Sequence, residues 1–254
     1  MRTTLLLAVV TLCACGSDGA NGEFGKVRFS MVFDAQEVSD FKPPIALGSS
    51  LLIKLEEPST FPAGEAKEPG FPELTLDVKP VGHKGGAKVL PLGFAQYAIQ
   101  LDSEGDYQLV AKEKDVVLDS LSVKSAKADH IRLSPKANVT TSVRNGTQTC
   151  VRADSLNLND VLLRRNQTAT FEVTAADKDD KAMLGLLGLT ASEDGDLLEL
   201  DTTWLFETGT PNGLVVKPKG TLTEKAIVHV TEASGMKIDV EIKTANEDAT
   251  PSCN

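Results

Sequence analysis

Short stretches in which apolar and polar residues alternate constrain the fold of this chain most strongly. Successive side chains of a β-strand point to opposite faces, so a period of two residues predicts a half-buried strand. No long segment has the 3.6-residue period of an amphipathic helix. Alternation occurs over residues 27–33, 51–55, 74–78, 95–101, 107–111, 121–123, 131–133, 169–175, 226–230 and 238–242. The sequence therefore predicts an all-β fold, a sandwich or a barrel.

The first residues have the pattern of an export signal. One positive charge at Arg2 is followed by the apolar run Leu5–Leu12 and then by small and polar residues from Gly16. A membrane-spanning helix needs roughly 20 apolar residues, and this run is less than half that length. The segment is therefore expected to direct export and then to be removed.

The cleavage region Leu12-Cys13-Ala14-Cys15 resembles the lipobox of bacterial lipoproteins. The resemblance implies removal of residues 1–14, lipid on the thiol of Cys15 and a lipidated, flexible tether over residues 15–23. The residue after Cys15 is Gly16, whereas many lipoproteins of the inner membrane have Asp at this position. The resemblance therefore implies that the protein is located in the outer membrane of a bacterial cell envelope. The alternative is an ordinary secretory signal that happens to contain two cysteines.

The remaining cysteines suggest a disulfide. With Cys13 removed and Cys15 lipidated, the mature chain keeps Cys150 and Cys253. An even number of cysteines in an oxidising compartment predicts a bridge, here one that joins the C-terminus to the start of the second half. Two free thiols are the alternative.

The length of the mature chain favours two domains. Proline at Pro135, followed by polar residues, predicts a boundary between a β-sandwich over 24–135 and a second over 136–254. Internal similarity supports a repeat: residues 47–55 parallel 165–173, and residues 104–110 parallel 210–216. The second half is expected to have Leu214 in the place that Tyr107 has in the first.

These halves resemble tandem bacterial immunoglobulin-like domains. Gly48-Ser49-Ser50 leads into an alternating strand, and Asp102–Tyr107 is similar to the approach to a tyrosine corner, in which the phenol bonds to upstream backbone. The resemblance implies two tandem immunoglobulin-like β-sandwiches, in a family that serves in adhesion, as spacers or as accessory modules.

The net charge argues against binding to nucleic acid. It is −10 at pH 7, with no basic cluster, whereas binding to phosphate requires clustered Lys and Arg. The same balance argues against a basic patch on anionic lipid. Contact with the membrane is instead expected through the lipid on Cys15.

No catalytic constellation is evident. His83, His130 and His229 are scattered, and neither an HExxH nor a GxSxG pattern occurs. The acidic stretches 177–180 and 193–196 are the best candidates for calcium, but neither matches the spacing of an EF-hand, and both suit solvated turns. We therefore expect no enzyme activity, no cofactor and no resident metal.

Aromatic residues make up only 5% of the chain, which gives a sugar-binding surface little support, and Trp204 with Phe206 is expected in the core. The sequence thus predicts a non-catalytic, lipid-anchored envelope protein for adhesion, structure or assembly, with a possible protein partner. The alternative is an accessory lipoprotein that binds a small molecule, calcium or polysaccharide, with the proline-rich loop Pro58–Pro72 as its candidate site.

Overall fold

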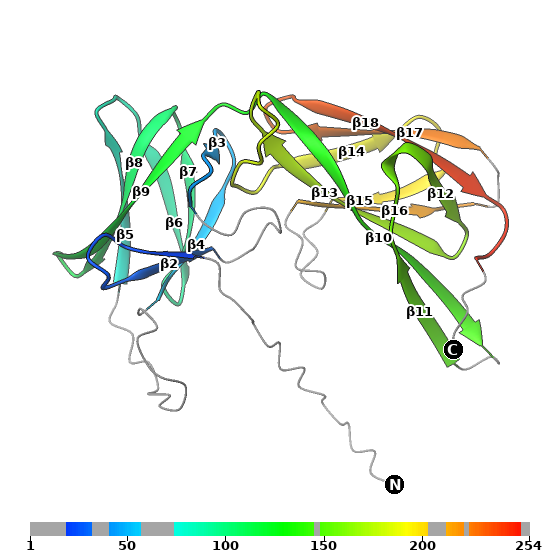
Figure 1. Ribbon diagram of the computed structural model, residues 1–254, viewed down its shortest axis with the longest axis horizontal. Helices are drawn as coiled ribbons and strands as arrows, with labels where there is room; N and C mark the ends of the chain where they lie inside the picture. The colour runs from blue at the N-terminus through cyan, green and yellow to red at the C-terminus, as the bar shows by residue number, and fades with distance from the viewer. Residues whose placement is uncertain are drawn as a thin grey trace, which may run out of the picture.

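The computed structural model describes residues 19–31, 41–56, 74–144, 148–202, 212–220 and 224–249, without the side chains of 142–144 and 148–153. These residues form four mostly antiparallel sheets, which are arranged in two units along the long axis of the molecule (Figure 1). The one helical element in the described ranges is the 3₁₀ turn η1 (Leu158–Asp160). No helix in these ranges is long and apolar enough to cross a membrane.

The first unit is a sandwich of two sheets. One sheet has the order β1-β2-β4-β7-β6, and the other has the order β3-β9-β8-β5. Its strands are β1 (Gly19–Asn21), β2 (Arg28–Met31), β3 (Ile45–Ala46), β4 (Leu51–Glu56), β5 (Leu74–Val81), β6 (Ala87–Gly93), β7 (Gln96–Leu101), β8 (Gly105–Glu113) and β9 (Val116–Ala126).

The second unit repeats this plan with the orders β11-β10-β13-β16-β15 and β12-β18-β17-β14. Its strands are β10 (His130–Arg144), β11 (Gln148–Asp154), β12 (Val161–Arg164), β13 (Gln167–Ala176), β14 (Leu189–Glu193), β15 (Leu198–Asp201), β16 (Gly213–Pro218), β17 (Lys225–Glu232) and β18 (Lys237–Ala245).

The strand order is that of an immunoglobulin fold in both units. Lettered along the chain, such a fold places strands A, B, E and D in one sheet and C, F and G in the other. The rows β2-β4-β7-β6 and β10-β13-β16-β15 follow the first order. In the facing sheets β3 and β12 pair in parallel with the last strands β9 and β18, as the second half of strand A does. The predicted pair of immunoglobulin-like sandwiches is confirmed.

Each unit has its own core, filled by the inward residues of both of its sheets. Phe29, Ile53 and Leu109 meet in the first unit, while Phe171 and Val228 lie in the second. All five side chains are almost fully buried. The alternating pattern of the sequence is thus explained by strands with one face in the core and the other in water.

Strand β10 continues through Pro135, although this proline was expected to mark the boundary between the two sandwiches. Pro135 pairs with Phe171, and the register then shifts, so that Lys136 is the extra residue of a bulge. A bulge tolerates the missing N–H of proline. The Lys136 ammonium also forms an ion pair with the buried Glu172 of β13. A domain limit at residues 127–129, between β9 and β10, agrees with the pairing better than one after 135.

Part of the segment expected to be a flexible tether is a strand. Residues 19–21 form β1, whose Gly19 pairs with Ser30 and whose Asn21 pairs with Arg28. The chain therefore enters the first sheet four residues after Cys15.

The two units are joined by a segment that we call the clasp, in which residues 182–187 of the second unit lie against residues 44–50 of the first. Leu184 N–H donates to the Pro44 carbonyl (2.9 Å), and Ala46 N–H donates to the Leu184 carbonyl (2.8 Å). Ser50 and Leu186 exchange a second pair of backbone hydrogen bonds, of 3.0 and 2.6 Å. Because Leu184 also belongs to the first core and Ala46 to the second, the cores are physically interlocked.

The clasp depends on a glycine at its closest approach. Gly185 has φ +122°, and a Cβ atom there would overlap the hydroxyl of the buried Ser49. Asn212 holds the same loop from within the second unit: its Nδ2 donates to the Gly185 carbonyl (3.1 Å), and its Oδ1 accepts from Leu187 N–H (2.6 Å). The apolar run 183–189 is therefore the loop through which the second unit contacts the first.

The structure supports one of the two internal parallels and overturns the other. Residues 47–55 and 165–173 lead into β4 and β13, which occupy the same place in their sheets. Residues 105–110 lie in β8, however, whereas residues 213–216 lie in β16, which belongs to the other sheet. The counterpart of β8 is β17, so Leu214 does not stand where Tyr107 does.

Candidate functional site

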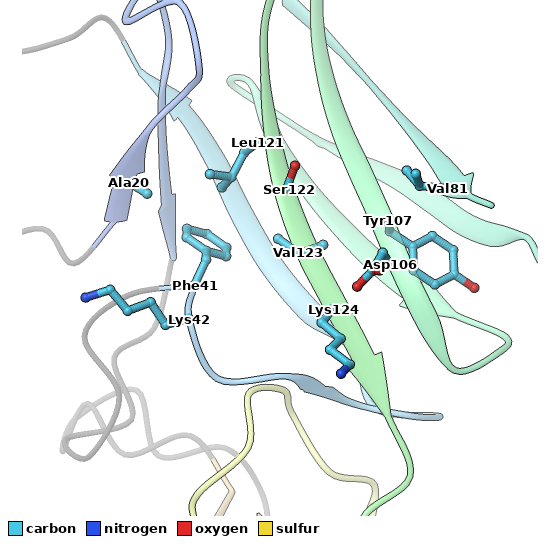
Figure 2. A pocket seen from close by; sticks show the side chains of 10 residues that line it. All are labelled: Ala20, Phe41, Lys42, Val81, Asp106, Tyr107, Leu121, Ser122, Val123 and Lys124. Carbon is cyan, nitrogen blue, oxygen red and sulfur yellow. The ribbon is translucent and has the colours of Figure 1, made fainter. Parts of the chain in front are cut away.

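A groove runs along the edge of β9 in the first unit. Phe41, just before β3, and Ala20 of β1 lie across from β9, and Figure 2 shows the Phe41 ring beside Leu121 and Val123. Its volume is about 660 Å³, within the range of small-ligand pockets. The lining residues are Ala20, Phe41, Lys42, Val81, Asp106, Tyr107, Leu121, Ser122, Val123 and Lys124.

Backbone groups of β9 point into this groove. The Ser120 carbonyl accepts a hydrogen bond from Glu23 N–H (2.7 Å), on the side of β9 away from β8. Because backbone direction alternates along a strand, Ser122 and Lys124 direct their N–H and C=O groups to that same side. Because β3 pairs with β9 at Ser125 and Ala126 and Glu23 bonds to Ser120, the part of this edge where an extended peptide could pair is the short stretch around Ser122.

A buried carboxylate lies on β9 just beyond one end of the groove. Asp119 of β9 has no exposed surface. Its carboxylate accepts from the backbone N–H groups of Phe24 (2.8 Å), Lys26 (2.6 Å), Val27 (2.9 Å) and Ser120 (2.8 Å). We call this arrangement the Asp119 latch, since it fixes the loop between β1 and β2 onto the opposite sheet.

The hydrogen bonds of the latch keep the Asp119 carboxyl ionised, and the close packing around the carboxylate requires glycine at position 22. Burial alone would raise the pKa of the carboxyl, but the four N–H donors together hold the pKa below its usual range. A Cβ atom on Gly22 would overlap the carboxylate, so only glycine fits there. The latch is a structural site, made from groups that are satisfied within the protein.

At the other end of the groove, Tyr107 forms the predicted tyrosine corner. Its side chain is fully buried, and its hydroxyl donates to the Ser103 carbonyl four residues upstream (3.1 Å). The same hydroxyl lies 2.7 Å from the Ser103 hydroxyl and 3.3 Å from the Gly86 carbonyl. The second unit has no counterpart, because Tyr97 and Tyr107, both in the first unit, are the only tyrosines of the chain.

Removing the hydroxyl in Tyr107→Phe should lower the free energy of unfolding by about 1–2 kcal/mol, since the half-buried Ser103 carbonyl then loses its donor. Urea titration followed by circular dichroism measures the change. Ser122→Ala, which removes an exposed hydroxyl from the same groove, should stay within about 0.5 kcal/mol of the parent. Equal effects of the two substitutions would contradict the corner.

The three histidines occupy separate places, as the sequence suggested. His83 lies in the turn after β5, with Nε2 2.9 Å from the Asp106 carbonyl and its ring edge-on to Tyr107 at 4.9 Å. His130, the first residue of β10, forms ion pairs with Asp129 and Asp180.

His229 lies on the surface of β17 between two carboxylates. Its Nδ1 is 2.8 Å from Asp239, and its Nε2 is 3.3 Å from Asp194. The hydrogen bond to Asp239 and then that to Asp194 raise the pKa of His229 above its usual value. Ion pairs of this exposed kind contribute little to stability.

The His229 pair gives a pH-dependent prediction. A raised folded-state pKa contributes stability below the unfolded pKa of about 6.5 and loses it as pH rises through the folded value. NMR titration of the imidazole should therefore give a midpoint above 6.5, and Asp239→Asn should lower it. Asp77→Asn in the first unit should leave it unchanged, and a midpoint below 6.5 in the parent would contradict the pairing.

Acidic groups in the stretches proposed for calcium are used within the protein. Asp177 accepts from the backbone N–H of Asp179 and of Lys181, and these hydrogen bonds, the one from Lys181 foremost, lower its pKa. In the second stretch Asp196 pairs with Lys219, and Glu193 accepts from Leu198 N–H.

Among the residues that the structure describes, no group of three or more His, Cys, Asp or Glu is placed to hold a metal. Several predicted residues lie outside that part of the chain: Cys15, Cys253, the loop Pro58–Pro72, and Trp204 with Phe206. Cys150 is in β11, opposite Ser142.

Sequence reasoning missed the groove and the Asp119 latch. The Asp119 carboxylate and the amides that it accepts from are up to 95 positions apart, so no local motif joins them. A lone carboxylate between the apolar run Val116–Leu118 and the alternating residues 121–123 was the one sign of the latch in the sequence.

No protein-family model and no curated protein matches the chain. Solved structures with partial similarity include domains 5–6 of the S-layer protein SbsC (11% identity, 87% of this chain and 98% of that one, TM-score 0.32). Another is the Escherichia coli adhesin FdeC, with 12% identity, coverage of 90% of this chain and 66% of that one, and a TM-score of 0.32. A third is the bacterial integrin-binding protein invasin, with 13% identity, coverage of 90% of this chain and 41% of that one, and a TM-score of 0.28. The fold assignment rests on the strand order of this chain.

Proposed function

We propose that this chain is a non-catalytic protein of the bacterial cell envelope, anchored by lipid on Cys15, that serves in adhesion, structure or assembly. The lipobox-like residues 12–15 support the anchor and the location, with the outer membrane as the preferred site. The two immunoglobulin-like units supply a body that can extend away from a surface.

The clasp is the observation that carries this proposal. A three-residue connection, 127–129, already limits the freedom between the units. The backbone hydrogen bonds of Leu184 and Leu186 add a second point of attachment, and the interlocked Leu184 and Ala46 exclude water from it. Two points of attachment restrict bending between the units, whereas a single connection would act as a hinge. The protein therefore holds its two ends at a fixed separation.

The β9 groove favours a second candidate, an accessory lipoprotein that binds a ligand. Backbone groups of Ser122 and Lys124 and the apolar wall of Phe41, Leu121 and Val123 suit an extended chain better than an ion. Loss of partner capture on Lys124→Glu, a change at an exposed side chain of the groove, with unfolding unchanged, would favour this function over a purely structural one.

Replacement of the proposed lipid acceptor tests the main function. Cys15→Ser should move the chain from the membrane fraction to the soluble fraction, because the thioether cannot form without a thiol. Cys13→Ser is the matched control, two positions away in the same segment, and should leave the chain in the membrane fraction. A Cys15→Ser variant that stays membrane-bound would overturn the anchor.

A further inference from the structure

The clasp holds a segment of the first unit that also forms one wall of the β9 groove. Residues 41–47 run from this wall to the residue after β3, and Figure 2 shows Phe41 and Lys42 at the start of the segment. The Phe41 side chain is only 5% exposed and lines the groove together with Leu121 and Val123. The clasp and the groove therefore share one short stretch of chain.

Strand β3, within this segment, is held from two sides. On one side Ile45 and Ala46 pair in parallel with β9. On the other side the clasp residue Leu184 donates its N–H to the Pro44 carbonyl and accepts from Ala46 N–H. Since β3 has only two residues, its ladder with β9 is short, and the clasp supplies a second set of backbone hydrogen bonds.

Side-chain packing adds to this hold. Ile45 is fully buried in the first core and forms a β-bridge with Leu184, which is buried in the same core. Withdrawal of Leu184 would leave a cavity beside Ile45, and an apolar side chain that borders a cavity is held by fewer contacts. Opening of the clasp therefore weakens the attachment of β3 to the first unit.

Two prolines connect β3 to the groove wall. Pro43 and Pro44 stand between Lys42 and Ile45, and a proline ring fixes φ at about −65°. Consecutive prolines form a semi-rigid spacer. A movement of Ile45 is therefore passed on to Phe41, instead of being absorbed by the backbone between them.

The position of β3 also sets how much of the β9 edge is available. With the clasp closed, β3 covers the edge at Ser125 and Ala126, which leaves the stretch around Ser122. Without β3 the same edge would be open from Ser122 to Ala126, which is a typical length for a strand. An extended peptide adds to a sheet through a free edge of this kind.

We propose that the clasp is a conformational switch for the β9 groove. When it is closed, it holds β3 and Phe41 in place and keeps the free edge of β9 short. When it opens, the segment 41–47 detaches and the edge becomes long enough to bind an extended chain. This inference rests on the second function proposed above, in which the groove binds such a chain. Bending between the units controls binding, because the clasp is the contact that bending breaks.

Hydrogen exchange in the full chain tests the coupling. Leu184 N–H reports the clasp, and Leu47 N–H, which donates to the Ala126 carbonyl of β9 (2.9 Å), reports the attachment of β3. In low urea the two amides of the parent should open with the same free energy, while the amide of Leu109 in the middle of β8 stays protected. Gly185→Ala should speed exchange at Leu184 and Leu47 by the same factor, about tenfold or more, and Gly235→Ala should change neither.

Two results would overturn the switch. One is a Leu184 amide that opens in less urea than Leu47, or that speeds up in Gly185→Ala while Leu47 stays slow. The other is a Leu109 amide that opens together with both, because the event would then be unfolding of the whole first unit.

Tryptophan at the groove wall reports whether the groove changes with the clasp. Phe41→Trp is combined with Gly185→Ala or with Gly235→Ala, and the same chains without Phe41→Trp give the Trp204 background. Acrylamide should quench position 41 weakly beside Gly235→Ala and several-fold more strongly beside Gly185→Ala. Equal quenching would mean that Phe41 keeps its place when the clasp opens, which contradicts the switch.

The switch and the function on which it rests fail in different ways. Neither measurement uses a ligand, so partner capture that is unchanged in Lys124→Glu would count against the second function alone. Slow exchange at Leu47 when Leu184 opens, or equal quenching at position 41, would count against the switch alone.

Discussion

Replacing Asp119 by alanine is expected to lower the free energy of unfolding by about 3–4 kcal/mol, one of the largest effects of any single substitution in this chain. The carboxylate accepts from the N–H groups of Phe24, Lys26, Val27 and Ser120. Alanine would leave donors without an acceptor at a fully buried position. The loop between β1 and β2 would then detach from β9 and uncover the groove.

The effect should depend on pH in a defined direction. Because the N–H donors outweigh burial and lower the pKa of Asp119, its contribution is fully present above the unfolded pKa of about 3.9. It is lost as pH falls through the lower folded pKa. The difference between parent and variant should therefore be constant near neutrality and shrink in acid.

Urea unfolding at several pH values measures both expectations. Asp77→Ala is the matched control, since Asp77 is a half-exposed carboxylate of the same unit whose partner is the Lys112 ammonium. Surface pairs of this kind contribute at most about 1 kcal/mol. If Asp119→Ala cost no more than Asp77→Ala, the latch would not stabilise the unit.

Gly185→Ala should release the clasp and lower the free energy of unfolding by about 3 kcal/mol. The residue has φ +122°, and the added Cβ would overlap the buried Ser49 hydroxyl. The loop must move away, and its hydrogen bonds through Leu184 and Leu186 are then lost. Since the connection 127–129 remains, the units should stay linked but bend relative to each other.

Gly235→Ala is the control that measures the free-energy cost of backbone strain alone, at a glycine outside the clasp. Gly235 also has positive φ, +96°, but a Cβ there meets nothing within 4 Å, so it should cost only about 1 kcal/mol. Hydrogen exchange should speed up at the amides of Leu184 and Leu186 in Gly185→Ala and stay slow in Gly235→Ala. Slow exchange in both variants would mean that the clasp tolerates the added carbon.

The sequence predicted those features that depend on residues close together in the chain. Alternation located the core strands, because one face of each strand must be apolar, and the stretch Asp102–Tyr107 predicted a corner whose hydrogen bonds span four residues. Alternation was a weaker signal for strands at the edge of a sheet. It did not predict β6 (Ala87–Gly93), because the apolar residues Leu90 and Leu92 of this strand are exposed. At Pro135 the rule that proline ends a strand failed because a bulge absorbed it.

The candidate sites depend on contacts between distant parts of the chain, which a single sequence does not encode locally. The Asp119 latch needs the register between β9 and a loop about 95 residues earlier. The clasp joins Ser49 to a loop 135 residues later, and the apolar run 183–189 gave no indication that its partner was the other unit. The β9 groove likewise exists only once β1, β3 and β9 are placed together.

Intact mass spectrometry of the membrane-extracted protein, before and after reduction, tests the central claim most directly. We predict a chain that begins at Cys15, carries added acyl mass, and gains two hydrogens on reduction through a Cys150–Cys253 disulfide. An unacylated mature chain would contradict the proposal of a lipid-anchored envelope protein, and an acylated chain with no change on reduction would contradict only the disulfide.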